Sequence, residues 1–217
     1  MSCCARYCVA ETQFDPKVAE RDLRRYQRHG PDASTRMLLA ELRRWPLQGL
    51  RLLDVGSGIG TIAMELAGAG LTAVTLADAS PAYLEAARRQ VGPLYASRPA
   101  QFVLGDFAAN ASTLPDADVV TLDRVVCCYP DVDALLQAAS MRARQLVAFT
   151  YHPGRWYLHA AVALENLSYR VRSNPFRAFV HSPERMASVL GAAGFVRAAR
   201  RETFPWALDL YRRASLA

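Results

Sequence analysis

Apolar runs long enough to cross a membrane are missing from the sequence. The most apolar stretches, such as residues 61–77, are interrupted by Thr, Glu and Gly, whereas a membrane-spanning helix needs about 20 mostly apolar residues. A hydrophobic leader is also missing, because the charged residues Glu11, Asp15 and Lys17 follow the first ten residues, where a signal peptide keeps its apolar region. The sequence therefore predicts a cytoplasmic protein without a transmembrane segment.

Cysteine is scarce and unevenly placed. The five cysteines lie at positions 3, 4, 8, 127 and 128, and an odd number arranged in this way is a poor disulfide framework. No C-x-x-C spacing typical of a zinc site occurs. We expect reduced thiols and no metal site. Low-complexity and collagen-like chains are excluded too, since the 217 residues contain only 12 Gly and 12 Pro.

The residues that are present suit one globular domain. Hydrophobic residues make up 52% and charged residues 21% of the chain, which is typical of a folded protein. The net charge of +6 is uneven, because residues 140–217 hold 12 basic and 4 acidic residues, whereas residues 50–139 hold 5 and 10. A basic final third fits either an anionic partner or a solvated face of arginines. Without an RNA-binding aromatic motif or helix-turn-helix spacing, no nucleic-acid partner is expected.

Strands and helices alternate along the middle of the chain. Apolar periodicity predicts strands at 51–55, 72–77, 102–104, 118–123 and 145–151, and helices at 61–69, 81–91 and 131–144. Two helices precede them, at 16–28 and 34–45, the second with Ser34 or Thr35 as its cap. A helix at 155–172, another from Pro183 to Gly194 and an antiparallel pair at 195–203 and 206–212 follow. Such alternation predicts an α/β fold, doubly wound around a parallel sheet that is covered on both faces.

The whole chain, residues 1–217, reads as a single domain. Its expected parts are a helical lid at 1–49, a ligand-binding core at 50–151, an insertion at 152–182, and a closing helix and hairpin at 183–217. The insertion combines aromatic residues and arginines between prolines, so we interpret it as a small helical cap over a substrate pocket. Its helix also fits contact with a membrane surface, which ranks lower.

Three groups of residues follow the first three expected strands, where an open parallel sheet binds its ligands. Gly56, Gly58 and Gly60 lie between a strand and a helix, so their backbone can approach a ligand closely. Asp78 ends the second strand, where its carboxylate can accept both hydroxyls of a ribose. Asp106 and Phe107 end the third, where they suit an adenine amine and ring. Taken alone, each group also fits a tight turn or a helix cap.

These residues resemble the first three motifs of class I S-adenosylmethionine-dependent methyltransferases. The matching segments are Leu52-Leu-Asp-Val-Gly-Ser-Gly-Ile-Gly60, Leu76-Ala-Asp78 and Leu104-Gly-Asp-Phe107. The resemblance covers residues 50–150 and implies a Rossmann-like seven-stranded sheet with an antiparallel C-terminal hairpin. It also implies S-adenosyl-L-methionine as cofactor, with Gly56, Gly58 and Gly60 facing its methionine part and Asp54 nearby, Asp78 at the ribose, and Asp106 and Phe107 at the adenine. Ser57 and Ala79 complete the expected cofactor-binding residues.

The layout is also similar to the magnesium-protoporphyrin O-methyltransferase branch of that family. The shared features are a helical N-terminal lid, a short insertion after the fifth strand and a compact hairpin end. This similarity concerns the arrangement of the elements and does not identify the substrate.

Candidate catalytic residues lie after the fourth and fifth strands and in the lid. In the family the fourth-strand segment borders the methyl group, so Asp123 and Arg124 are candidates for wall or polarising groups. Tyr129 is expected either to orient the substrate or accept its proton, or simply to begin a helix that Asp131 caps. In related enzymes an N-terminal helix covers the cofactor, which makes Tyr26 a candidate.

Histidines are candidate bases because they titrate near neutral pH. His152 is favoured over the others because it follows the fifth strand at the ligand end of the sheet. His29 belongs to the same lid segment as Tyr26, and a surface or packing role is the alternative for all four histidines, His29, His152, His159 and His181.

The adjacent Cys127 and Cys128 suggest a second idea. Two thiols, joined by Cys3, Cys4 or Cys8, would suit a soft centre such as trivalent arsenic. Neighbouring residues on a strand point to opposite faces, so the pair converges only if the chain turns there. The alternative is that both are small buried hydrophobic residues.

The function predicted from the sequence is methyl transfer to a small-molecule acceptor through an oxygen, sulfur or nitrogen atom. A planar or anionic acceptor suits the basic, aromatic insertion. The alternatives are methylation of a thiol or a soft inorganic acceptor such as arsenite at the cysteine pair, and a cofactor-binding protein without catalysis. The sequence carries no signal of the oligomeric state.

Overall fold

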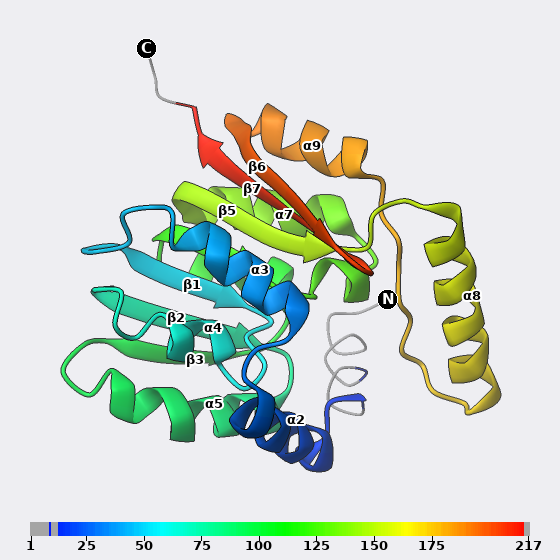
Figure 1. Cartoon of the computed structure of the whole chain (residues 1–217), viewed down its shortest axis with the longest axis horizontal. Helices are drawn as coiled ribbons and strands as arrows, with labels where there is room; N and C mark the ends of the chain where they lie inside the picture. The colour runs from blue at the N-terminus through cyan, green and yellow to red at the C-terminus, as the bar shows by residue number, and fades with distance from the viewer. Residues whose placement is uncertain (1–8, 10–12, 215–217) are drawn as a thin grey trace.

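The computed structural model describes Val9 and residues 13–214. Its centre is a seven-stranded sheet in the order β3-β2-β1-β4-β5-β7-β6 (Figure 1). The strands are β1 (Arg51–Val55), β2 (Ala73–Asp78), β3 (Ala100–Leu104), β4 (Ala117–Leu122), β5 (Ala143–Tyr151), β6 (Phe195–Thr203) and β7 (Trp206–Arg213). The first five are parallel, and β7 pairs antiparallel with both β5 and β6. The predicted doubly wound sheet with a closing hairpin is confirmed.

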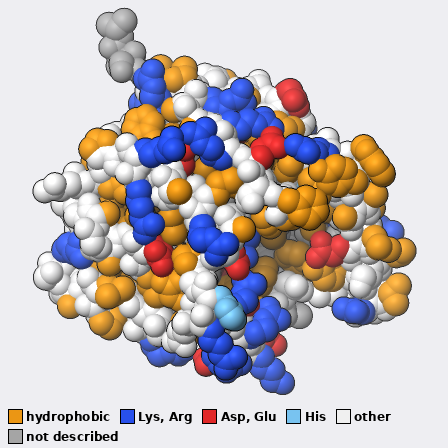
Figure 2. Space-filling view, in the orientation of Figure 1, with side chains coloured by type: hydrophobic (Ala, Val, Ile, Leu, Met, Phe, Trp, Pro, Cys, Tyr) orange, Lys and Arg blue, Asp and Glu red, His pale blue; other side chains and the backbone are white. Residues whose placement is uncertain are grey.

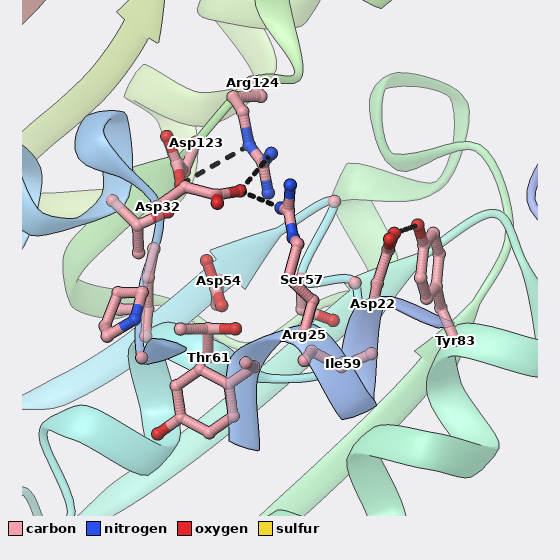
Figure 3. Close-up of a pocket in the computed structure, with 17 residues that line it drawn as sticks. Asp22, Arg25, Asp32, Asp54, Ser57, Ile59, Thr61, Tyr83, Asp123 and Arg124 are labelled. Atoms are coloured by element: carbon pink, nitrogen blue, oxygen red, sulfur yellow. Dashed lines mark hydrogen bonds and ion pairs between the residues drawn. The ribbon is translucent and has the colours of Figure 1, made fainter. Parts of the chain in front are cut away.

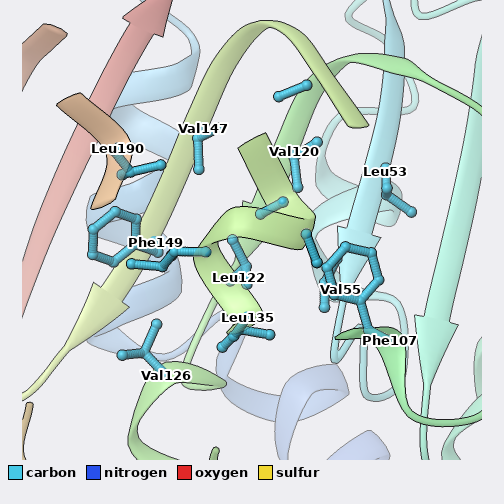
Figure 4. Packing of buried hydrophobic residues seen from close by; sticks show 14 of the residues in the cluster. Leu53, Val55, Phe107, Val120, Leu122, Val126, Leu135, Val147, Phe149 and Leu190 are labelled. Atoms are coloured by element: carbon cyan, nitrogen blue, oxygen red, sulfur yellow. The ribbon is translucent and has the colours of Figure 1, made fainter. Parts of the chain in front are cut away.

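Helices cover both faces of the sheet. They are α2 (Pro16–His29), α3 (Ala33–Leu42), α4 (Thr61–Glu65), α5 (Pro81–Leu94), α6 (Phe107–Asn110), α7 (Val132–Arg142), α8 (Trp156–Val171) and α9 (Pro183–Ala192), with short 3₁₀ turns η1 (Ala111–Thr113) and η2 (Val126–Cys128). Side chains of α3, α4 and α5 form one core with the sheet, and α6, α7 and α9 form the other. Figure 4 shows the second core, where Leu53, Val120 and Phe149 are fully buried. Apolar strands with two covered faces explain this layering.

Helix starts follow the chemistry expected of them. Ser80, Asp131 and Ser182 each accept a hydrogen bond from a backbone N–H of the first turn of α5, α7 and α9. A proline follows Ser80 and Ser182, and its fixed φ suits the first helical position. The serine-proline pairs at Ser80 and Ser182 are visible in the sequence, and the Asp131 cap is the helix-entry alternative given for the Tyr129 segment.

Several expectations about helix ends were wrong, since α3 ends at Leu42 instead of residue 45 and α5 runs to Leu94 instead of residue 91. Neither Ser34 nor Thr35 caps α3, because both are buried inside the helix and Asp32 occupies the capping position, where its side chain makes no capping hydrogen bond. The Thr35 hydroxyl donates instead to Asp123 in the candidate site. Helix α4 ends at Glu65 instead of residue 69, since the following Leu-Ala-Gly-Ala-Gly segment favours turns over helix.

Helix α8 stands apart from the two helical layers, beside the carboxyl ends of the strands (Figure 1). It lies within the predicted insertion at 152–182, between β5 and α9. Residues 172–182, which we call the strap, lead from α8 to α9. The strap contacts the core where the Phe179 N–H donates a hydrogen bond to the Cys127 carbonyl at 2.7 Å. None of the helices in the part of the chain that the structure describes is both long and apolar enough to span a bilayer.

Candidate active site

A cavity lies where β1 and β4 end, beneath α2 and the turn that joins α2 to α3 (Figure 3). The sheet contributes its floor, the loop after β1 one side and the helical lid its roof. The lining residues are Asp22, Arg25, Tyr26, Gly30, Pro31, Asp32, Thr35, Asp54, Gly56, Ser57, Gly58, Ile59, Thr61, Ile62, Tyr83, Asp123 and Arg124. The position matches the general rule that open α/β sheets bind ligands outside the carboxyl ends of their strands.

The glycine loop after β1 shapes one wall of this cavity. Gly56 has φ 61°, and a Cβ added there would lie 2.3 Å from Cγ2 of Val125, so only glycine fits. Gly58 has φ 54° but open space where its Cβ would be, which leaves its backbone accessible to a ligand. Gly60, the N-cap of α4, packs tightly against Val91 of α5. One glycine thus faces open space, while the other two allow close packing.

Asp78 ties the glycine loop to the end of β2. Its carboxylate accepts hydrogen bonds from the N–H groups of Gly58 and Ser80, both at 2.8 Å. Burial raises the pKa of Asp78 to about 6, although these backbone bonds and one from Ala79 lower it. The carboxylate therefore holds the loop in shape, and its place at the end of β2 is the one expected for ribose binding. The ribose role of Asp78 and the cofactor-binding role of Ala79 stay predictions.

Two buried polar atoms in the cavity wall lack partners within the described part of the chain. The Thr121 hydroxyl donates to Oδ1 of Asp54 at 2.7 Å, but Oδ2 of Asp54 and the hydroxyl of Ser57 have no hydrogen bond there. Burial raises the pKa of Asp54 to about 7, with the nearby carboxylates of Asp123 and Asp78 adding to the rise. Buried polar groups without partners are costly, so these atoms point to a polar or cationic ligand.

The residues present fit the cofactor implied by the resemblance. S-adenosylmethionine carries an ammonium and a sulfonium group, and Oδ2 of Asp54 is a buried acceptor without a described partner. Gly58 leaves room for close approach of the ligand to the backbone. Asp54, Ser57 and Gly58 would therefore hold the methionine part of the cofactor.

Asp106 and Phe107 lie where the third motif was expected, at the end of β3. Oδ1 of Asp106 accepts bonds from the Ala108 N–H at 3.1 Å and the Tyr129 hydroxyl at 2.9 Å. Phe107 is only 7% exposed and belongs to the core between the sheet and α7. The helix-cap alternative for Asp106 is therefore present in the structure, and the adenine roles of both residues stay predictions.

Asp123 and Arg124 join the sheet to the lid. The carboxylate of Asp123 accepts from the hydroxyls of Thr150 at 2.6 Å and Thr35. Arg124 takes φ 60°, an uncommon conformation for a residue with a side chain, and its guanidinium pairs with Asp32 at 2.7 Å. Although burial opposes the charge, the carboxylates of Asp123 and Asp32 raise the pKa of Arg124.

The lid adds residues that the sequence did not single out. Arg25 pairs with Asp32, the same carboxylate that binds Arg124, so one acidic group joins two guanidinium groups above the cavity. On the other side, the Tyr83 hydroxyl donates to Asp22 at 2.6 Å (Figure 3). The helical periodicity of residues 16–28 was visible in the sequence, but nothing in it indicated which charged side chains face the core.

The candidate bases occupy different surroundings. Tyr26 lines the cavity, donates to Glu65 at 3.0 Å, and has its pKa raised to about 12 by burial and by that bond. His152 does not line this cavity, since it stacks on Trp206 with ring centroids 4.2 Å apart and contacts the Pro205 carbonyl. A proton-accepting role for either stays a prediction.

The other histidines lie away from the cavity wall. His29 and His159 are exposed, and His181 binds the carbonyl of Tyr129 at 2.9 Å. These three histidines therefore occupy the surface or packing positions that the sequence analysis gave as the alternative to a catalytic role.

The two neighbouring thiols do converge. Cys127 and Cys128 belong to the 3₁₀ turn η2, and their sulfur atoms are 3.6 Å apart. The turn supplies the change of direction that convergence required. Cys3, Cys4 and Cys8 lie outside the described residues. Over the described part of the chain, no group of three or more His, Cys, Asp or Glu side chains is arranged to hold a metal ion.

Comparisons with known proteins agree with this geometry. The sequence model of the methyltransferase-domain family matches residues 52–146. The search of curated protein sequences gave no significant match. Among solved structures, the chain is similar to magnesium protoporphyrin IX methyltransferase from Synechocystis PCC 6803 with bound S-adenosylhomocysteine. The TM-score is 0.74 at 20% identity, and the match covers 95% of this chain and 99% of that one.

Two further structures share the fold. An O-methyltransferase family 2 protein from Planctomyces limnophilus in complex with apigenin has a TM-score of 0.60 at 18% identity, over 86% of this chain and 63% of that one. Human N-acetylserotonin methyltransferase in complex with S-adenosylmethionine has a TM-score of 0.58 at 20% identity, over 84% and 52%. Residues 52–146 therefore match a methyltransferase domain, and the chain has the fold of class I S-adenosylmethionine-dependent methyltransferases.

Proposed function

We propose that this enzyme transfers the methyl group to a small-molecule acceptor with an oxygen, sulfur or nitrogen nucleophile. The observation that carries the proposal is the lid. Helix α2 and the turn after it roof the cavity, and Asp32 ties that roof to Arg124 through an ion pair. A site roofed in this way suits a compact acceptor, because a polymer strand would require the roof to open.

When bound, S-adenosylmethionine supplies an electrophilic methyl group. The protein's part is then to hold the acceptor in line and to exclude water, which is where most of the rate enhancement of such a transfer would arise. Asp54, Ser57 and Gly58 would position the cofactor, and Asp123 and Arg124 would border the acceptor. A base such as Tyr26, Tyr129 or His152 is needed only if the nucleophile carries a proton.

The aromatic and charged side chains near the end of β4 support a planar or anionic acceptor. Tyr129 is half-buried after β4, and Phe179 of the strap stacks on His181 with centroids 5.7 Å apart. The strap lies against η2 through the Phe179 N–H bond, so its rings are close to the end of β4. The Arg124 guanidinium lies near the same edge, where it pairs with Asp32. We propose that the insertion at 152–182 covers the acceptor, and a cytoplasmic location stays a prediction.

A second candidate acceptor is a thiol or a soft inorganic centre such as arsenite. It is favoured by the 3.6 Å separation of the Cys127 and Cys128 sulfurs, because two thiols this close can both reach one soft centre. Against it, hydrogen bonding to Cys128 and burial raise the pKa of Cys127 well above its usual range, which disfavours the reactive thiolate.

The experiment that separates these proposals follows labelled methyl groups. Purified protein is incubated with methyl-labelled S-adenosylmethionine and a small-molecule extract, and the label is partitioned into volatile, organic, aqueous and macromolecular fractions. Label in the organic or aqueous fraction supports a small-molecule acceptor, and volatile label favours the thiol or arsenic acceptor. Label in macromolecules would contradict the main proposal. Intact cofactor binding with no transfer to any fraction would favour a noncatalytic role.

A double variant then tests the cysteines. Replacing Cys127 and Cys128 by Ser should leave transfer to an organic acceptor intact but abolish formation of a volatile product. Unchanged volatile product in the double variant would rule out the cysteine-dependent acceptor.

A further inference from the structure

Helix α8 turns its apolar side away from the protein. Its inner side is held by Leu158, which is buried, and by Asn166, which exchanges two hydrogen bonds with the backbone of Ala178 at 2.8 and 2.9 Å. The outward residues follow at intervals of three or four: Trp156, Ala160, Leu164, Leu167 and Val171. At 3.6 residues per turn these positions share one face. A helix on a protein surface normally points such a face inward, so α8 is reversed.

The outward side chains are among the most exposed large apolar groups described. Trp156 is 79%, Val171 78% and Leu164 69% exposed, and Leu167 is 55% exposed. Phe204, in the turn between β6 and β7, is 80% exposed and its ring stacks near Tyr157 at the start of the helix. Figure 2 shows hydrophobic side chains gathered along α8. Scattered exposed apolar residues are ordinary, but a contiguous patch marks a contact surface.

The charges around this face are positive. Arg170 and Arg172 are exposed at the end of α8, and within the described residues neither forms an ion pair. The one acidic residue of the helix is Glu165, which accepts a hydrogen bond from the Tyr169 hydroxyl at 2.7 Å. Residues 140–217 as a whole carry 12 basic and 4 acidic side chains. Apolar residues with an aromatic anchor and flanking arginines are typical of a helix that lies in a membrane interface.

We propose that α8, together with Phe204, binds the surface of an anionic lipid bilayer. The apolar stripe would enter the boundary between headgroups and acyl chains, with Trp156 and Phe204 at one end and the arginines paired with lipid phosphates at the other. A second copy of the chain suits the face less well, since two strongly basic regions would then be brought together. The proposal concerns where the enzyme works and is independent of the identity of the acceptor.

The test uses the full chain and vesicles of two compositions. In sedimentation, the protein should bind vesicles of phosphatidylcholine mixed with phosphatidylglycerol and bind pure phosphatidylcholine more weakly. Binding should also shift the emission of Trp156 to shorter wavelength, and W156F should lose most of that shift. The double variant L164E/L167E should lower the partition coefficient by on the order of tenfold or more, because two leucine side chains no longer leave water.

A matched control separates the patch from general hydrophobicity. Met141 on α7 is 63% exposed and lies outside the patch, so M141E should bind vesicles as the parent does. Absence of binding to the anionic vesicles, or equal binding by L164E/L167E and the parent, would overturn the proposal. So would a parent that is dimeric in size-exclusion chromatography without lipid while L164E/L167E is monomeric, because the face would then bind a second copy. Since the exposed leucines support no core, cofactor binding should be unchanged in both variants.

Discussion

The buried carboxyl of Asp54 should make the stability of the enzyme fall between weakly acidic and weakly basic pH. In the folded chain burial raises its pKa from 3.8 to about 7. In the unfolded chain it ionises near pH 4. Between these values the folded state binds more protons than the unfolded state, and stability then decreases as pH rises. The loss begins near pH 4 and is complete above pH 7.

The size of the effect follows from linkage. For one group with these two pKa values, the free energy of unfolding drops by about 2 kcal/mol between about pH 5.5 and pH 8. The variant Asp54→Asn keeps an acceptor for the Thr121 hydroxyl but cannot ionise. The free energy of unfolding of the variant should therefore not show the decrease that ionisation of Asp54 causes in the parent. Asp78, whose raised pKa acts in the same direction, remains in both proteins, so the difference between them isolates Asp54.

The assay is urea unfolding of both proteins at the two pH values without cofactor. Calorimetry of S-adenosylmethionine binding near pH 7, in two buffers of different ionisation enthalpy, adds an independent readout. The parent should release protons on binding, because a cationic ligand favours the ionised carboxylate, and the variant should release fewer. Equal pH dependence of stability in the two proteins would refute the buried, partly protonated state of Asp54.

Three further predictions concern this cavity and the glycine loop and lid around it. Asp78→Ala should weaken S-adenosylmethionine binding by about 1.5–3 kcal/mol in calorimetry, as expected for lost hydrogen bonds to a charged acceptor, and unchanged affinity would refute the ribose role. Gly56→Ala should lower stability by about 1–3 kcal/mol, because its methyl group would collide with Val125. Gly49→Ala, also at positive φ but with open space, should cost less in the same thermal melts. Asp32→Asn should change the free energy of unfolding by less than about 1 kcal/mol, since its ion pairs are partly exposed. It should increase proteolytic cleavage of the lid, and equal cleavage of variant and parent would contradict the role of Asp32 in holding the lid to Arg124.

The sequence predicted the core of the fold because local and long-range signals agreed there. The strand, glycine loop and helix at residues 51–65 combine an apolar run with residues that only a tight turn accepts, and the N-caps at Ser80, Asp131 and Ser182 are local chemistry. Strands β6 and β7 are joined by a short connection, so their antiparallel pairing could also be predicted from the sequence.

The lid could not be placed in this way. Asp22, Arg25 and Asp32 look like ordinary surface charges in a charged helix and turn, and only tertiary packing brings them over the cavity. Thr35 was mistaken for a cap because its residue type suits one, whereas Asp123 captures its hydroxyl. The outward apolar face of α8 was similarly hidden, since periodicity reveals an apolar stripe but not the direction in which it points.

The order of the strands has a consequence for biosynthesis. Strand β7 lies between β5 and β6, yet it is translated after both of them. A nascent chain that has reached residue 203 therefore holds β6 without a neighbour to pair with, and the edge of β5 stays open until β7 is available. An open edge of this kind invites pairing with other chains, and domains made on the ribosome pass through such exposed states. We expect ribosome-bound chains that stop before Trp206 to recruit holdase chaperones, and chains that extend beyond Arg213 to lose that interaction.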